Sequence, residues 1–153
     1  MSYWDKKLVR EQLDKKLLEL KQLPEKPFNG WIKTIREALG MTTSQLAGRV
    51  KVDQSRITKI ERAEPDLNLK LSTMEKVADG LGMKFVYGFA PKDSLEDIVR
   101  DQARKLALKR MQRLDHTMRL ELQNLNQEEK EKAIRDMVDR LLIEGDKELW
   151  EIK

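Results

Sequence analysis

The chain has 153 residues and a formal net charge of +4, with 38% charged and only 5% aromatic residues. This length suits one small domain with or without helical extensions, and the low aromatic, glycine and proline content argues against an all-β fold. The absence of cysteine excludes disulfides and thiolate metal sites, and a single histidine excludes a zinc cluster built on imidazoles.

The sequence contains no catalytic signature. It has no glycine-rich nucleotide-binding loop, no cysteine nucleophile and no histidine pair, and His116 stands alone within a helical pattern. We therefore expect no enzyme activity, no catalytic residues, no metal and no cofactor. The first residues lack an apolar leader and no run approaches about 18 apolar residues, so we expect a cytoplasmic protein without membrane contact.

Hydrophobic periodicity predicts a helix over 5–23 and another over 31–39. The proline-containing segment 24–30 is expected to be a linker. In the first helix the apolar residues recur at helical spacing and should face inward; they are Val9, Leu13, Leu17 and Leu20.

The stretch 41–61 predicts two short helices, 44–50 and 54–63, joined by a tight turn. Thr42 or Thr43 is expected to cap the first helix, and Asp53 the second. The local core consists of Leu46, Ala47, Val52, Ile57 and Ile60.

The second of these helices turns polar side chains outward, namely Gln54, Ser55, Arg56 and Lys59. Such side chains hydrogen-bond base edges in a DNA major groove; Gln pairs with adenine and Arg with guanine. Glu61, on the same helix, is expected to bond back to the helical core.

The positive charge is concentrated around these helices. Residues 31–63 contain seven basic and three acidic residues, a net charge of +4. This equals the net charge of the whole chain, so the basic and acidic residues outside this segment are equal in number. This placement suits phosphate contact, although a chance fluctuation gives the same numbers.

Beyond this region, Ser72 and Glu75 predict a capped helix over 72–81, and 84–90 carries the one good strand pattern. A lone strand needs a partner, so we expect Phe85, Val86 and Tyr87 to pair with a second copy across a twofold axis. The alternative is an extended tail packed on the core. Helices are then predicted over 94–123 and 128–143.

The spacing from Gln45-Leu46-Ala47 to Ile60-Glu61 resembles the lambda-repressor-like, or Xre-type, helix-turn-helix family. The resemblance implies base contacts from Gln54, Ser55, Arg56 and Lys59. It also implies phosphate contacts from Thr43 and the start of the first motif helix; we assign phosphate contacts to Thr43 and Ser44 there, and to Lys51 in the turn. Gly48 inside that helix departs from the pattern and costs about 1 kcal/mol relative to Ala.

The outer segments, including 30–41, 86–87, 94–96 and especially 116–123, resemble the family called mobile mystery protein A. The resemblance covers the chain from about residue 12 to Trp150. Members of that family are typically encoded beside a Fic-domain protein, and Fic proteins usually transfer AMP from ATP to a hydroxyl group of a target. The resemblance implies a toxin–antitoxin pair with this chain as antitoxin.

Inhibitors of Fic enzymes carry a helix with Ser or Thr followed four residues later by Glu and then Gly or Asn. Thr117 and Glu121 have this spacing, although Leu122 replaces the final residue. A chance match is the alternative to an inhibitory helix.

Together these patterns predict a mainly α fold with one short strand. We expect an N-terminal helix and linker over 1–29, a helix-turn-helix domain over 30–91 and a helical region over 92–153. The expected function is a homodimeric DNA-binding autorepressor that reads an inverted repeat in double-stranded DNA, with a Fic toxin as partner. The alternative is an interaction module that inhibits a partner through its terminal helices with little specific DNA binding.

Overall fold

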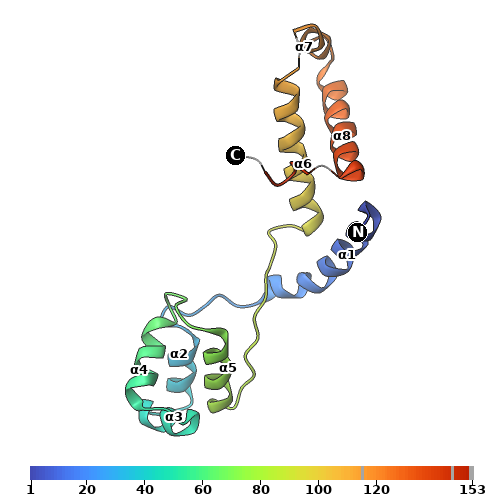
Figure 1. Cartoon of the computed structure of the whole chain (residues 1–153). Coiled ribbons are helices and arrows are strands. Elements are labelled where there is room, and N and C mark those ends of the chain that lie inside the picture. The colour runs from blue at the N-terminus through green and yellow to red at the C-terminus, as the bar shows by residue number, and fades with distance from the viewer. Residues whose placement is uncertain (115, 146, 152–153) are drawn as a thin grey trace. The chain divides into compact units, whose positions relative to one another are not determined.

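The computed structural model describes residues 1–114, 116–145 and 147–151, and they form two compact units. Residues 23–88 make up one unit, and residues 1–22 pack with the described part of 89–153 in the other. The elements in Figure 1 are α1 (Tyr3–Leu17), the 3-10 helix η1 (Leu18–Gln22), α2 (Trp31–Ala38), α3 (Thr43–Val50), α4 (Gln54–Ala63), α5 (Leu71–Gly80), α6 (Leu95–Gln112), α7 (His116–Gln123) and α8 (Gln127–Glu144).

The helix predicted over 94–123 is wrong as one continuous element, because α6 ends at Gln112 and α7 begins at His116. The backbone tightens where α6 ends: Arg113 N–H bonds to the Arg110 carbonyl at 3.1 Å and Leu114 N–H to the Met111 carbonyl at 3.3 Å. Such bonds to the third residue back commonly close a helix. No glycine or proline lies at this break, and the apolar periodicity continues across it, so the sequence did not indicate that the helix ends here.

The unit of residues 23–88 is a bundle of α2, α3, α4 and α5 around one small core. Its buried apolar residues are Ile32, Leu46, Ala47, Ile57, Ile60, Val77 and Leu81. Gly80 is buried where α5 meets the end of α3, and a Cβ there would lie 2.5 Å from Val50 Cγ2. A hydrogen atom in place of a side chain therefore lets the two helices approach.

A buried ion pair joins α2 to α4. Arg36 Nε lies 2.5 Å from Glu61 Oε1, and Arg36 Nη2 lies 3.2 Å from Glu61 Oε2. Arg36 Nη1 also donates to the Met41 carbonyl at 2.7 Å. These bonds to Glu61 raise the pKa of Arg36 above its ordinary value, so the guanidinium stays charged although it is buried. The expected structural role of Glu61 has its geometric basis here.

A second buried carboxylate closes the start of α2. Glu64 is 4% exposed, and its Oε2 accepts a 3.0 Å hydrogen bond from Ile32 N–H. A negative group at a helix N-terminus satisfies a free backbone donor and complements the helix dipole. Gly30 precedes α2 with φ of +80°, and a Cβ on it would overlap Glu64 Oε2. The glycine thus makes room for the carboxylate.

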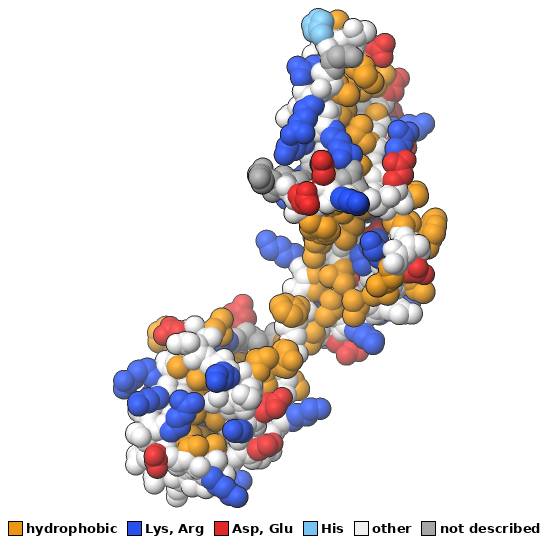
Figure 2. All heavy atoms as spheres, viewed as in Figure 1, with side chains coloured by type: hydrophobic (Ala, Val, Ile, Leu, Met, Phe, Trp, Pro, Cys, Tyr) orange, Lys and Arg blue, Asp and Glu red, His pale blue; other side chains and the backbone are white. Residues whose placement is uncertain are grey.

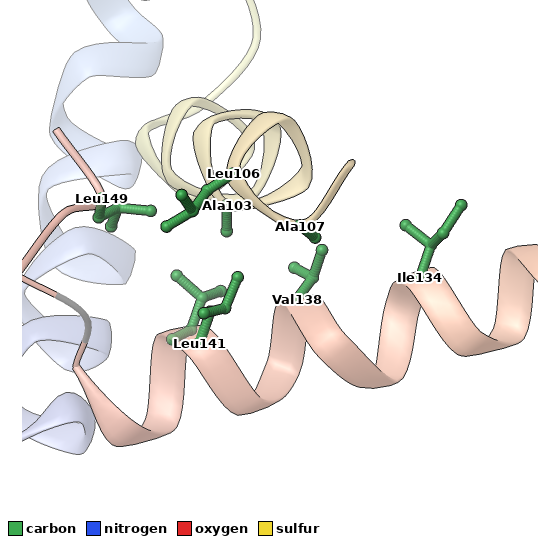
Figure 3. Close-up of a cluster of buried hydrophobic side chains, with 8 residues drawn as sticks. Ala103, Leu106, Ala107, Ile134, Val138, Leu141 and Leu149 are labelled. Carbon is green, nitrogen blue, oxygen red and sulfur yellow. The ribbon is translucent and has the colours of Figure 1, made fainter. Parts of the chain in front are cut away.

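In the other unit, α6 and α8 run side by side and share an apolar core (Figure 1, Figure 3). Figure 3 shows Ala103, Leu106 and Ala107 of α6 facing the side chains of α8. The buried residues of this core are Ala103, Leu106, Ala107, Ile134, Val138, Leu141, Leu142 and Leu149. Two alanines on α6 permit close approach of the helices, while the branched residues of α8 fill the space.

Helix α1 packs on α6 through polar groups. Arg10 Nε lies 2.7 Å from Glu96 Oε2, and Asp14 Oδ1 accepts a 2.7 Å bond from Leu95 N–H at the start of α6. The predicted inward stripe is therefore partly wrong: Val9 and Leu13 remain 42% and 41% exposed. Periodicity finds the apolar face of a helix, but these partners on α6 decide which face is turned inward.

The prediction of a strand over 84–90 is wrong for the single chain, because its described residues contain no β-strand. This segment is irregular, and Val86 and Tyr87 are each 64% exposed. The rings of Phe85 and Tyr87 stack at 5.8 Å between centroids. A β-strand is defined by backbone hydrogen bonds to a neighbouring strand, and the single chain offers this segment no such neighbour.

The buried pair of Arg36 and Glu61 gives a first prediction. Glu61→Gln should lower the free energy of unfolding of residues 23–88 by about 3–5 kcal/mol, because it leaves a buried guanidinium without its counter-charge. Urea denaturation monitored by Trp31 fluorescence, with Trp4 and Trp150 replaced by Phe, measures this change.

The matched control removes both charges. Arg36→Met combined with Glu61→Leu should recover most of the lost stability, since neither ion then has to be desolvated. An unchanged urea midpoint in Glu61→Gln alone would contradict the role given to this pair.

Candidate nucleic-acid interface

The first motif helix, α3, begins with reciprocal capping. Thr42 Oγ1 accepts from Gln45 N–H at 3.1 Å, while Gln45 Oε1 accepts from Thr42 N–H at 2.9 Å. Of the two threonines expected to cap, Thr42 is thus the cap, and Thr43 is the first helical residue. This capping box leaves the backbone N–H groups of Thr43 and Ser44 in the first turn, where a helix end favours anions.

The turn between α3 and α4 depends on a strained residue. Lys51 has φ of 63° and ψ of 48°, the left-handed conformation that glycine usually supplies. Its backbone N–H bonds to the Ala47 carbonyl, and Val52 N–H bonds to the same oxygen at 3.0 Å. Asp53 then precedes α4 in an extended conformation, without the side-chain capping bond expected of it.

The face of α4 that is predicted to read bases is exposed, whereas its other face is buried. Ile57 and Ile60 are 0% and 2% exposed, and they hold α4 against the core. The predicted base-reading residues are all exposed; they are Gln54, Ser55, Arg56 and Lys59. Because the apolar face is fixed, these four side chains project from a rigid support.

One hydrogen bond links the residues predicted to read bases to those predicted to contact phosphate. Gln54 Nε2 donates to Thr43 Oγ1 at 2.8 Å, so the starts of α4 and α3 are joined. An amide nitrogen carries two hydrogens, so one remains, together with both lone pairs of the amide oxygen. The amide is oriented by Thr43 and still keeps the donor and acceptor that a bidentate adenine contact requires.

Charge on this unit is arranged around α4. Arg36, one of the seven cations counted in 31–63, is buried against Glu61, so this segment loses one charge of each sign from its surface. The excess of positive charge is unchanged. Figure 2 shows Lys and Arg side chains gathered on the side of the unit where α4 lies.

Two further cations lie on the same unit and were not among the predicted site residues. Lys33 of α2 and Arg62 of α4 line a polar hollow together with Asn29 and Thr58. Arg62 follows Lys59 by three positions, a spacing that puts both on neighbouring parts of one helix surface. That spacing could have identified Arg62, whereas Lys33 depends on how α2 packs.

The other predicted sites lie outside this unit or at its end. Thr117 and Glu121 are exposed on α7, four residues apart, next to exposed His116. Among the described residues no hydrogen bond or ion pair joins them to another predicted site, and their inhibitory role stays a prediction.

Residues 32–87 match the family model described as Helix-turn-helix. No curated protein and no solved structure matches the chain. This part of the chain is therefore a helix-turn-helix domain of the Xre type, and the match contains α3, the turn and α4.

Two negative findings apply to the described residues. None of their helices is both long and apolar enough to cross a bilayer. No group of three or more His, Asp or Glu side chains among them is arranged to hold a metal ion.

The strained turn gives the second prediction. Lys51→Gly should raise the free energy of unfolding by about 0.5–1 kcal/mol, because glycine adopts the left-handed conformation without steric cost. The same change should weaken DNA binding and reduce the salt dependence by about one phosphate contact. Thermal unfolding and binding titrations at several salt concentrations measure the two effects.

Lys51→Ala separates charge from conformation. It removes the same charge but keeps a Cβ in the left-handed region, so it should weaken binding as Lys51→Gly does without raising stability. A Lys51→Gly protein less stable than the parent would contradict the assignment of strain.

Proposed function

We propose that this chain is a sequence-specific DNA-binding repressor that acts on its own promoter. The main support is helix α4 of the helix-turn-helix domain. One face of α4 is buried in the core, and the other exposes Gln54, Arg56 and Lys59. Amide and guanidinium groups are the side chains that most often discriminate base edges in the major groove. Thr43, Ser44 and Lys51 would position the helix by contacting phosphates.

We further propose that two copies act together on an inverted repeat. A helix-turn-helix dimer places its recognition helices in half-sites about 10 bp apart, or a multiple of that spacing. The segment Phe85–Tyr87 supports this proposal, because Val86 and Tyr87 are solvent-exposed and the described residues give the segment no backbone partner. Two such segments, one from each copy, could complete a two-stranded ribbon.

The third prediction tests base reading. The purified chain should protect a specific sequence upstream of its own gene against excess random DNA, and protection should weaken steeply with salt. Arg56→Ala should cost about 1–3 kcal/mol in binding free energy and relax the preference at one base pair. Footprinting and titration against operator variants measure both effects. Lys76→Ala, on exposed α5, is the matched control.

The outcomes of that experiment are distinct. If Arg56→Ala weakens binding to all DNA sequences equally, Arg56 contacts only phosphate. If the parent chain binds every sequence alike, the repressor proposal fails. Val86→Arg should abolish cooperative protection of the two half-sites while leaving weak binding to a single half-site, because it places like charges across the proposed ribbon.

A second function, inhibition of a Fic-domain toxin, is favoured by two features of the terminal helices. Helix α1 leaves Trp4 and Leu8 65% and 55% exposed, as a protein-binding surface would. Helix α7 exposes Thr117 and Glu121 on one side. We propose that the Glu121 carboxylate forms an ion pair with the toxin arginine that otherwise binds the γ-phosphate of ATP.

The fourth prediction tests this inhibition. The product of the neighbouring gene should transfer AMP to a target protein, and this chain should suppress the transfer. Glu121→Gly should release the activity, since the carboxylate is lost. Gln123→Gly controls for the effect of a glycine in the same short helix. Equal inhibition by the parent and Glu121→Gly would remove Glu121 from the mechanism.

A further inference from the structure

The helix-turn-helix unit contains a groove that none of the predicted DNA-contacting residues lines. Its volume is about 290 Å³, and its lining surface is almost entirely apolar. The lining residues are Leu23, Pro24, Trp31, Ile32, Ile35, Met74, Ala78, Leu81, Met83, Lys84, Phe85 and Val86. All of them belong to the unit of residues 23–88.

The groove lies between α2, α5 and the chain that follows α5. Met83 N–H bonds to the Ala78 carbonyl at 2.8 Å, which holds the start of the irregular segment against α5. Buried Leu81 contributes to the lining, while the short side chain of Ala78 leaves space beside it. Met74 and Met83 border that space, and methionine adapts readily to ligands of varied shape.

A single cationic side chain, Lys84, is the only charged group among the lining residues. It is exposed, and the described residues offer it no ion pair or hydrogen bond. An apolar cleft with one convergent charged group is the usual composition of a small-molecule site, because the apolar lining supplies affinity and the polar group fixes orientation.

We propose that this groove binds an amphipathic anion, a carboxylate with an unbranched aliphatic chain, whose head group pairs with Lys84. The volume is close to the lower end of the range for ligand pockets, roughly 300–1,000 Å³, which suits a medium-length chain. Each methylene buried should strengthen binding about fourfold until the groove is full.

The site stands apart from the DNA-binding proposal. None of the base-reading or phosphate-contacting residues lines the groove. The ribbon proposed for two copies needs the backbone edge of Phe85–Tyr87, whereas the ligand needs the side chains of α2, α5 and 83–86, so the two proposals share only Phe85 and Val86. Ligand binding can therefore be measured without DNA, and its failure would leave the repressor proposal intact.

Trp31 in the groove provides the measurement. The full chain with Trp4 and Trp150 replaced by Phe is titrated with hexanoate, octanoate and decanoate while Trp31 emission is followed. We expect saturable binding of one ligand per chain, with affinity rising about sixteenfold for each added pair of methylenes. No saturable change with decanoate at millimolar concentration would overturn the proposal.

Charge and space are tested by matched variants. Lys84→Glu should weaken decanoate binding at least about fivefold, since an attraction becomes a repulsion, whereas Lys76→Glu on exposed α5 should not. Ala78→Leu should fill the groove and abolish binding while circular dichroism remains that of the parent.

Three results would overturn the proposal. The first is decyltrimethylammonium binding as tightly as decanoate, because the head-group charge would then not be recognised. The second is equal binding by the parent and Lys84→Glu. The third is a decanoate affinity that falls as protein concentration rises, because a second copy would then occupy the groove.

Discussion

The bidentate pair between Arg36 and Glu61 is the interaction on which the DNA-facing geometry of this chain depends. It ties α4 to α2 from the buried side, and the third guanidinium bond, to the Met41 carbonyl, fixes the corner that leads into α3. The side chains predicted to read bases project from the exposed face of α4. Because desolvating two ions is expensive, this pair contributes less to net stability than to directing how the helices meet.

Near that pair, two residues adopt conformations that suit the proposed DNA contacts rather than the stability of the fold. Lys51 adopts a conformation that glycine would adopt at lower cost, yet it brings a positive charge to the turn that faces the proposed phosphates. The bond from Gln54 to Thr43 fixes an amide that would otherwise lose rotamer freedom only on meeting DNA. Part of the entropic cost of recognition is therefore met when the chain folds.

Patterns within single segments predicted the helices well, whereas features that depend on a partner were missed. Residues 54–63 carry their own spacing and were placed correctly as α4. In contrast, the inward face of α1 is set by Glu96 and Leu95 of α6, which no periodicity within α1 reveals. The strand needed a second segment, and the break after Gln112 has no local signal. Arg36 was counted among the cations whose charge suits phosphate contact, because the burial of a charge depends on a counter-ion from another helix.

The discontinuous helical unit implies an order of folding during synthesis. Residues 23–88 contain every element of the helix-turn-helix core, so this unit can form as soon as its own last residues leave the ribosome. Helix α1 is synthesised first but can pack only after α6 has been made, since the partners of Arg10 and Asp14 lie on α6. A nascent chain that stops after residue 88 would therefore hold a folded helix-turn-helix unit and a helix α1 without its partners on α6.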